Sequence, residues 1–329
     1  MTSHPVPQAE ILPGTPWHSG ERLLQASIGA EERLAEVGPR VVRDYMPDQH
    51  RDFFAMLPSI VIGAVAPDGR PWATVRGGQP GFLHSPDPRR LDVALVRDAA
   101  DPADAGMEDG NAIGLLGIQP HTRRRNRMNG TIHRDATTGA QGFQVAVGQS
   151  FGNCPQYIQK RAPVMTRDPA TPASEPPEML DALDARARTL IRHADSFFVA
   201  TYVDLPGGQR QVDVSHRGGK PGFVRVDDDG TLTIPDFQGN TFFNTLGNMM
   251  ANPVAGLVFV SYATGDLLQL SGRTEVIIDS PEIATFDGAQ RLWRFTPEQI
   301  VRRDRALPLR WDIDPDGASP QALATGSWG

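Results

Sequence analysis

Arg123, Arg125 and Arg127 are the residues whose type and spacing most directly suggest chemistry. They alternate along a segment expected to be a strand, and a strand places alternate side chains on one face. Three guanidinium groups on one face repel one another unless an anion or carboxylates lie beside them. Two interpretations are therefore open: the arginines bind an anionic ligand, or they form a solvated or ion-paired face, for instance against the acidic residues of segment 101–109.

Asn244 and Thr245 stand at the expected start of a short helix over 242–250, which Asn252-Pro253 would end. Side-chain donors and the free N–H groups of a first helical turn can bind an anion. The same residue types also serve as plain helix caps. An anion site and a cap are thus both compatible with this pattern.

A repeat shows how such elements are organised. The segment 76–82 recurs as 217–223 with six of seven positions identical, at a separation of 141 residues. At a separation of 142 the echo continues, and the matching pairs are Gly114 with Gly256, Thr122 with Thr264, and Gly130 with Gly272. The period is far longer than that of solenoid repeats. We expect a duplicated domain, with a functional site between the two halves.

Composition limits the classes of protein to consider. With 329 residues, 39% hydrophobic and 22% charged, the chain has room for two globular domains. A net charge of −7 argues against nonspecific nucleic-acid binding. No apolar run is long enough to cross a bilayer, and no secretion signal is visible, so no membrane partner is expected. The single cysteine, Cys154, excludes an internal disulfide and favours a cytoplasmic location.

The pattern of hydrophobic residues predicts a mainly β fold with flanking helices. A helix over 21–37, ended by Gly38-Pro39, and a short helix over 48–56 come first. The strands expected in the first half are 59–65, 71–75, 89–96, 112–118, 124–132 and 142–151. A proline-rich linker over 162–178 and a helix over 181–193 follow. The second half is expected to hold the strands 197–203, 211–215, 223–226, 231–234, 256–260, 267–270 and 274–278. Many short strands with turns between them indicate antiparallel β-barrels, and no glycine fingerprint of a Rossmann domain is present.

Several motifs carry a family resemblance. They are the runs 212–219, 235–240, 244–248 and 252–253, together with 17–21, 43–47, 153–158 and 306–311. With these runs the chain resembles tandem flavin-nucleotide-binding proteins of the pyridoxamine 5′-phosphate oxidase-like superfamily, the FMN-binding split barrels. The resemblance implies antiparallel barrels that work in pairs, with FMN in the groove between them. It divides the chain into a helical extension (1–57), a first split barrel (58–161), a linker with a helix (162–194) and a second split barrel (195–329), which is the main FMN-binding half.

The resemblance also assigns candidate ligands. Ser215, His216 and Arg217 precede a glycine-rich turn and are expected to contact the phosphate or the ribityl chain. Asp236 and Asn240 lie in the loop 235–240 and are expected at the ribityl hydroxyls or the ring edge. The open alternative in both places is a plain turn.

Two further segments of the chain are expected to supply phosphate ligands. Asn244 and Thr245 stand where pyridoxamine phosphate oxidases carry part of a Ser-Arg-Lys cluster, so that oxidase activity is in doubt. Arg125 and Arg127 are expected to supply the missing cations, because their counterparts in the second half are not basic.

The resemblance predicts an FMN-dependent oxidoreductase that acts on an unknown small molecule, with NAD(P)H or a ferredoxin-type protein as electron donor. One flavin per chain is expected, with a homodimer as the candidate assembly. The alternatives are an F420- or haem-binding split barrel and a non-catalytic flavin carrier or sensor. No metal-ligand spacing is visible. Trp293, Phe295 and Trp311 are expected to pack in the second barrel, with one tryptophan on the flavin ring as the alternative.

Overall fold

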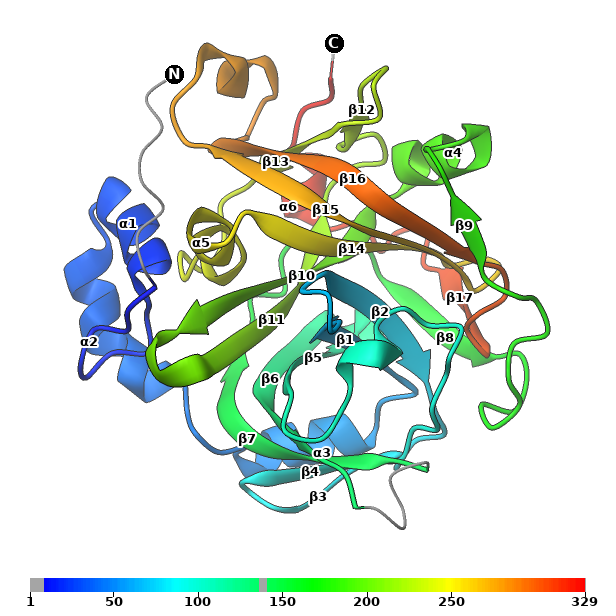
Figure 1. Ribbon diagram of the computed structural model, residues 1–329. Coiled ribbons are helices and arrows are strands. Elements are labelled where there is room, and N and C mark those ends of the chain that lie inside the picture. The colour runs from blue at the N-terminus through cyan, green and yellow to red at the C-terminus, as the bar shows by residue number, and fades with distance from the viewer. Residues whose placement is uncertain (1–8, 136–140, 329) are drawn as a thin grey trace.

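Two antiparallel β-sheets of seven and eight strands form the centre of the molecule in the computed structural model, which describes residues 9–135 and 141–328 (Figure 1). The helices lie around the sheets rather than between them (Figure 1). The mainly β fold class with an N-terminal helical extension, predicted from the sequence, is confirmed. No helix in these described ranges has both the length and the apolar character needed to span a membrane.

The first sheet runs in the order β2-β1-β5-β6-β7-β4-β3. Its strands are β1 (Ser59–Val65), β2 (Pro71–Gly77), β3 (Leu83–Asp87), β4 (Arg90–Val93), β5 (Ala112–Gln119), β6 (Arg124–His133) and β7 (Phe143–Gly152). Two 3₁₀ turns, η1 (Asp104–Gly106) and η2 (Pro120–Thr122), lie in its loops. All strands expected in the first half are present, with bounds shifted by a few residues.

The second sheet repeats that order as β11-β10-β14-β15-β16-β13-β12. Its strands are β10 (Ser196–Leu205), β11 (Gln209–Gly218), β12 (Arg225–Val226), β13 (Leu232–Asp236), β14 (Val254–Ser261), β15 (Asp266–Ile277) and β16 (Arg291–Arg303), with β9 (Glu178–Leu180) paired to β16 and the turns η3 (Pro206–Gly208) and η4 (Pro281–Thr285) in its loops. The expectation of two strands at 267–270 and 274–278 is wrong. Both belong to β15, which continues through a register shift at Ser271/Gly272.

The helices are α1 (Ser19–Ser27), α2 (Glu31–Val41), α3 (Asp48–Ala55), α4 (Ala185–His193), α5 (Asn244–Ala251) and α6 (Pro320–Leu323). The single helix expected over 21–37 is wrong in two respects. Gly29, with φ 67°, separates α1 from α2. Pro39 lies inside α2 near its C-terminal end, where the missing N–H removes only one hydrogen bond.

The segment 162–178 is not a plain linker. It contains most of β8 (Arg161–Met165), which pairs with β17 (Leu309–Ile313) in a separate two-stranded sheet. Pro163 is tolerated there because a strand of a two-stranded sheet has a free edge. Neither β16 nor β17 was expected from the sequence. Strand β17 joins the C-terminal part of the chain to the middle through its pairing with β8.

The two sheets pack directly on each other. Buried apolar side chains from both fill the interface, among them Val61, Leu116, Phe198 and Val258. The repeated glycines explain how closely the sheets approach. A Cβ at Gly114 would lie 2.7 Å from the carbonyl oxygen of Val212, and one at Gly256 would lie 2.3 Å from that of Pro71. These reciprocal contacts relate the two halves by an approximate twofold axis.

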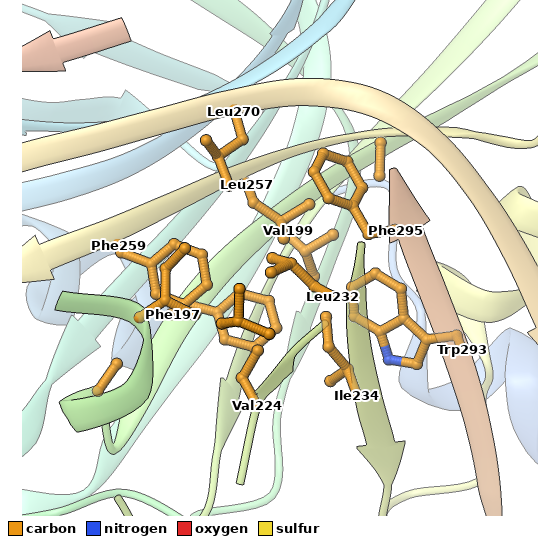
Figure 2. Packing of buried hydrophobic residues seen from close by; sticks show 14 of the residues in the cluster. Phe197, Val199, Val224, Leu232, Ile234, Leu257, Phe259, Leu270, Trp293 and Phe295 are labelled. Atoms are coloured by element: carbon orange, nitrogen blue, oxygen red, sulfur yellow. The ribbon is translucent and has the colours of Figure 1, made fainter. Parts of the chain in front are cut away.

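The second half has its own apolar core. Trp293 and Phe295 of β16 lie inside it among aliphatic residues of the neighbouring strands (Figure 2). Trp311 is buried in the cluster between the sheets, where its ring meets the edge of Tyr262. The expected packing role of these aromatic residues is confirmed. Trp293 is fully buried and is not among the residues that line the cleft described below.

Candidate anion-binding cleft

One cleft lies where the two halves meet, and all nine side chains predicted as ligands line it. Strand β6 of the first half contributes two of them, and the rest come from β11, from β13 and its following loop, and from the first turn of α5. The nine residues are Arg125, Arg127, Ser215, His216, Arg217, Asp236, Asn240, Asn244 and Thr245. Residues up to 120 positions apart in the chain thus line one cleft.

Arg125 and Arg127 face the cleft as their alternation predicts. The Nε of Arg125 donates to the carbonyl oxygen of Cys154 at 2.6 Å. Arg127 donates to the Asp213 carboxylate at 2.9 Å, and its guanidinium lies 5.2 Å from the centre of the Phe151 ring. The segment after β7 therefore holds Arg125, and β11 holds Arg127, before any ligand arrives.

Arg123 does not belong to this face. It precedes β6 with φ 56°, and its guanidinium donates to the carbonyl oxygens of Ile158, Gly317 and Ala318. The left-handed backbone turns its side chain away from the direction that a strand residue would take. The prediction of three arginines on one face is therefore wrong for Arg123.

The ion-paired alternative, against segment 101–109, does not apply to Arg125 or Arg127. Asp101 pairs with Arg303, whereas Asp104 and Glu108 pair with Arg97. The carboxylates of this segment thus form ion pairs with other arginines.

The first turn of α5 adds hydroxyl and backbone donors. Thr245 Oγ1 donates to Ser215 Oγ at 2.9 Å, and Ser215 Oγ also accepts a short hydrogen bond from Arg127. No side chain caps the N-terminus of α5. The first N–H groups of a helix have no intrahelical acceptor, and they favour negative charge. An anion at this end would satisfy them.

Arg217 and Asp236 form a further part of the cleft lining. Arg217 donates to one carboxylate oxygen of Asp236 at 2.8 Å, and Arg291 donates to the other at 3.0 Å. Asn240 is exposed, and its side chain accepts from the N–H of Phe242 at 3.2 Å, as a turn residue does. The Asp236 carboxylate therefore positions two arginines, and Asn240 shapes the loop.

The electrostatics of the cleft are those of an excess of positive charge. Burial, together with the charges of Arg127 and Arg217, lowers the pKa of Arg125 to about 10. Burial also lowers the pKa of Arg127, with a smaller contribution from Arg217. His216 is held well below its usual pKa by burial and by neighbouring arginines, so its imidazole is neutral. A bound anion would relieve this repulsion.

A charge count gives the size of the excess. Four arginines line the cleft, namely 125, 127, 217 and 291, against Asp236 in the lining and Asp213 behind it. The surplus is two positive charges. A phosphate monoester carries about −1.5 to −2 at neutral pH. The charge of the cleft thus matches that of one phosphate group.

Several buried polar atoms in the cleft lack partners. Among the described residues, no hydrogen-bond acceptor is found for the donors Arg127 Nε, Arg217 Nε and Asn153 Nδ2, and no partner is found for His216 Nδ1. Buried polar groups are nearly always paired, and an unpaired donor costs about 1–3 kcal/mol. These atoms point to a polar ligand that accepts hydrogen bonds.

The comparisons with known proteins are as follows. No protein-family model and no curated protein matches the chain. Three similar solved structures are a putative pyridoxamine 5′-phosphate oxidase from Lactobacillus delbrueckii (15% identity, 33% of this chain and 95% of that one, TM-score 0.27), the heme storage protein HutZ from Vibrio cholerae (16%, 37% and 95%, 0.26) and the FAD-binding protein from Mycobacterium smegmatis (15%, 39% and 98%, 0.26). Each of these matches covers between 33% and 39% of this chain.

Some lining residues were not predicted as ligands. Asn153 and Tyr157 follow β7, Phe243 precedes α5, Gln290 precedes β16, and Arg291 begins it. The run 153–158 is one of the motifs that carry the family resemblance, and this resemblance could have pointed to Asn153 and Tyr157. Nothing in the sequence pointed to Arg291, because its strand was not expected.

The glycines after Arg217 let the backbone approach other parts of the protein closely. A Cβ at Gly218 would lie 2.2 Å from the carbonyl oxygen of Tyr157, and one at Gly219 would lie 2.7 Å from the Phe223 ring. The close approach is to the protein itself and not to a ligand. The turn is architectural, whereas the arginine that precedes it lines the cleft.

Proposed function

We propose that this cleft binds FMN and that the chain is an FMN-dependent oxidoreductase of the pyridoxamine 5′-phosphate oxidase-like kind. The observation that carries the proposal is the surplus of two positive charges beside unpaired buried donors, at the seam of two halves with the same strand order. The shared strand order and the echoed segments further support a duplicated domain, with 58–161 and 195–329 as its copies.

The phosphate belongs at the end of the cleft where cations and hydroxyls converge. Arg125, Arg127 and Arg217 would hold it by charge-assisted hydrogen bonds, with the Ser215 hydroxyl as a further donor that Thr245 positions. The uncapped first turn of α5 would add backbone N–H groups. These partners would take the place of the missing Arg-Lys pair of pyridoxamine phosphate oxidases.

The remaining lining suits the ribityl chain and the ring. Asp236, Asn240 and Gln290 offer polar atoms along the loop side. Phe243, packed under the Arg291 guanidinium at 4.7 Å, offers an apolar face. Aromatic and cationic groups of this kind stack on planar rings.

When bound, FMN would supply the hydride chemistry, and the chain would bind, orient and shield it. We assign no catalytic acid or base to the protein. The substrate is a small molecule, the electron donor is NAD(P)H or a ferredoxin-type protein, and the protein works in the cytoplasm. Pyridoxamine phosphate is not the substrate we favour, because Phe243, Asn244 and Thr245 replace the Ser-Arg-Lys cluster.

A titration of the purified protein with FMN, followed by quenching of flavin fluorescence, tests the proposal. Arg125→Ala should weaken binding by about 1.5–3 kcal/mol, tenfold or more in Kd. Arg124→Ala is the matched control, because Arg124 is exposed on β6 and its guanidinium lies over Phe53, away from the cleft. Absence of FMN binding by the wild type, or equal effects of both variants, would contradict the proposal.

His216 favours a second candidate ligand, haem. Its imidazole lines the cleft in the neutral form, and its Nδ1 has no partner among the described residues. A neutral imidazole is the usual axial ligand of haem iron. The visible spectrum of the purified protein separates haem, the deazaflavin F420 and FMN. A haem band that His216→Ala abolishes would replace the flavin proposal.

A further inference from the structure

The loop 241–245 carries part of the cleft wall in an unfavourable backbone conformation. Thr241 has φ 64° and Phe243 has φ 61°, and neither is glycine. Side chains with a Cβ disfavour this left-handed region, and such residues persist only where their surroundings hold them. Thr241, Phe243, Asn244 and Thr245 all line the cleft. Something must therefore hold this loop in its ligand-facing shape.

The N-terminal extension makes the contacts that hold it. Gln25 of α1 is fully buried and donates to the carbonyl oxygen of Phe242 at 3.2 Å. The Trp17 ring packs on the Phe242 ring with centroids 5.0 Å apart. Arg33 of α2 reaches the Thr241 hydroxyl at 3.3 Å. The residue between the two strained positions is thus held from its main chain and its side chain.

A second set of contacts reaches the arginine of the cleft. Glu21 of α1 is 3% exposed, and its carboxyl accepts from Asn244 Nδ2 at 2.5 Å. Asn244 Oδ1 in turn accepts from Arg127 at 3.0 Å. His18, at the start of α1, is hydrogen-bonded to Asn248 of α5 at 2.8 Å. A chain of buried hydrogen bonds thus runs from the extension through α5 to a cation of the site.

We propose that helix α1 of the N-terminal extension is a clamp that holds the loop 241–245 in its ligand-binding shape, with Glu21 and Gln25 as positioning residues. The proposal rests on the proposed function in one respect, namely that the group held at Arg127 and the α5 N-terminus is a ligand phosphate. Glu21 and Gln25 do not line the cleft and act through Asn244 and Phe242.

Hydrogen exchange tests the clamp without a ligand. The backbone amides of 241–246 should exchange faster in Glu21→Ala and in Gln25→Ala than in the wild type, while the amides of β10 and β14 keep their protection. Glu31→Ala is the matched control, since Glu31 also belongs to the extension but forms a surface ion pair with Arg22. Unchanged exchange of the amides of 241–246 in both Glu21→Ala and Gln25→Ala would overturn the proposal.

The ratio of FMN to riboflavin affinity tests the consequence for binding. Because the hydrogen-bond chain ends at the phosphate side, Glu21→Ala should weaken FMN by about fivefold to tenfold and leave riboflavin, which has no phosphate, nearly unchanged. Glu21→Gln keeps an oxygen acceptor for Asn244 and should retain most of the preference for FMN. A general loss of stability would weaken both ligands equally, and that outcome would contradict the positioning role. Failure of the wild type to bind FMN would instead remove the proposed function, and the exchange experiment would still decide on the clamp.

Discussion

The approximate twofold axis relates the cleft to an equivalent groove between the two halves. The cleft is open, whereas the equivalent groove is closed. Arg217 in the cleft corresponds to Arg76 in the other groove at a separation of 141, and Arg127 corresponds to Gln269 at 142. Gln269 is fully buried, and its amide donates to the carbonyl oxygen of Ala73 and to the Asp101 carboxylate. The equivalent groove is thus filled by the protein's own side chains.

Asp101 is the residue that fills it. Its carboxylate lies 3.1 Å from Arg303 and 3.8 Å from Arg76, and it accepts from Thr74 at 2.6 Å. Burial alone would raise the pKa of Asp101, but the charges of Arg303 and Arg76 outweigh burial and lower it. A built-in carboxylate therefore occupies the second groove, where the open cleft offers a place for the anion of a ligand.

The loops between corresponding strands explain the difference. Between β13 and β14 the chain forms α5, whose first turn faces the cleft. Between β4 and β5 it forms a loop with only the short turn η1, and this loop carries Asp101. The two sheets have the same strand order. The presence of α5 in the second half, and of a loop with Asp101 in the first, thus accounts for a ligand site in one groove and a sealed interface in the other.

The largest expected effect concerns the sealed groove. Asp101→Ala should destabilise the protein by about 3–5 kcal/mol, because it leaves two buried arginines with less compensation. Urea denaturation measures the change, and Asp228→Asn, in an exposed turn, serves as the control. A loss similar to that of the control would mean that the groove is not sealed by this ion cluster.

The next prediction contrasts the two equivalent arginines. Arg217→Ala should weaken FMN binding by about 1.5–3 kcal/mol with little loss of stability, since Asp236 keeps its bond to Arg291. Arg76→Ala should do the reverse, because Arg76 is buried and holds the Val96 carbonyl oxygen at 2.7 Å. Parallel titrations and denaturation curves of the two variants check this. Equal losses of affinity would remove the distinction between the grooves.

A smaller effect is expected from the pH dependence of stability. Burial, and next the Asp213 charge, raise the pKa of Glu21 from its ordinary value near 4.5 to about 8 in the folded protein. The folded state then binds the proton more tightly, so this residue lowers stability as pH rises from about 4.5 to 8 and has a constant effect above that. Glu21→Gln should therefore gain stability relative to the wild type across this range. A pH-independent difference between the two would show that Glu21 is already ionised.

The sequence was a good guide to the elements that depend on local patterns. Apolar and β-branched residues predicted β1, β5, β6 and β7. Seven of the nine candidate ligands lie in the recognised motifs, and alternation along a strand singled out Arg125 and Arg127; all nine line one cleft. Arg123 was misplaced because a single left-handed residue reverses its direction, and periodicity does not reveal such a residue. The pairing of strands β8 and β17 joins segments almost 150 residues apart, and only the tertiary fold specifies it. Asp101 and Gln25 were missed for the same reason, since their partners are distant in the chain.

A crystal structure of the protein grown with FMN tests the central claim most directly. The account predicts one FMN per chain, with its phosphate against Arg125, Arg217 and the first turn of α5, and with Asp101 still in place in the other groove. FMN bound in the second groove, or a cleft that stays without flavin at saturating concentration, would contradict it.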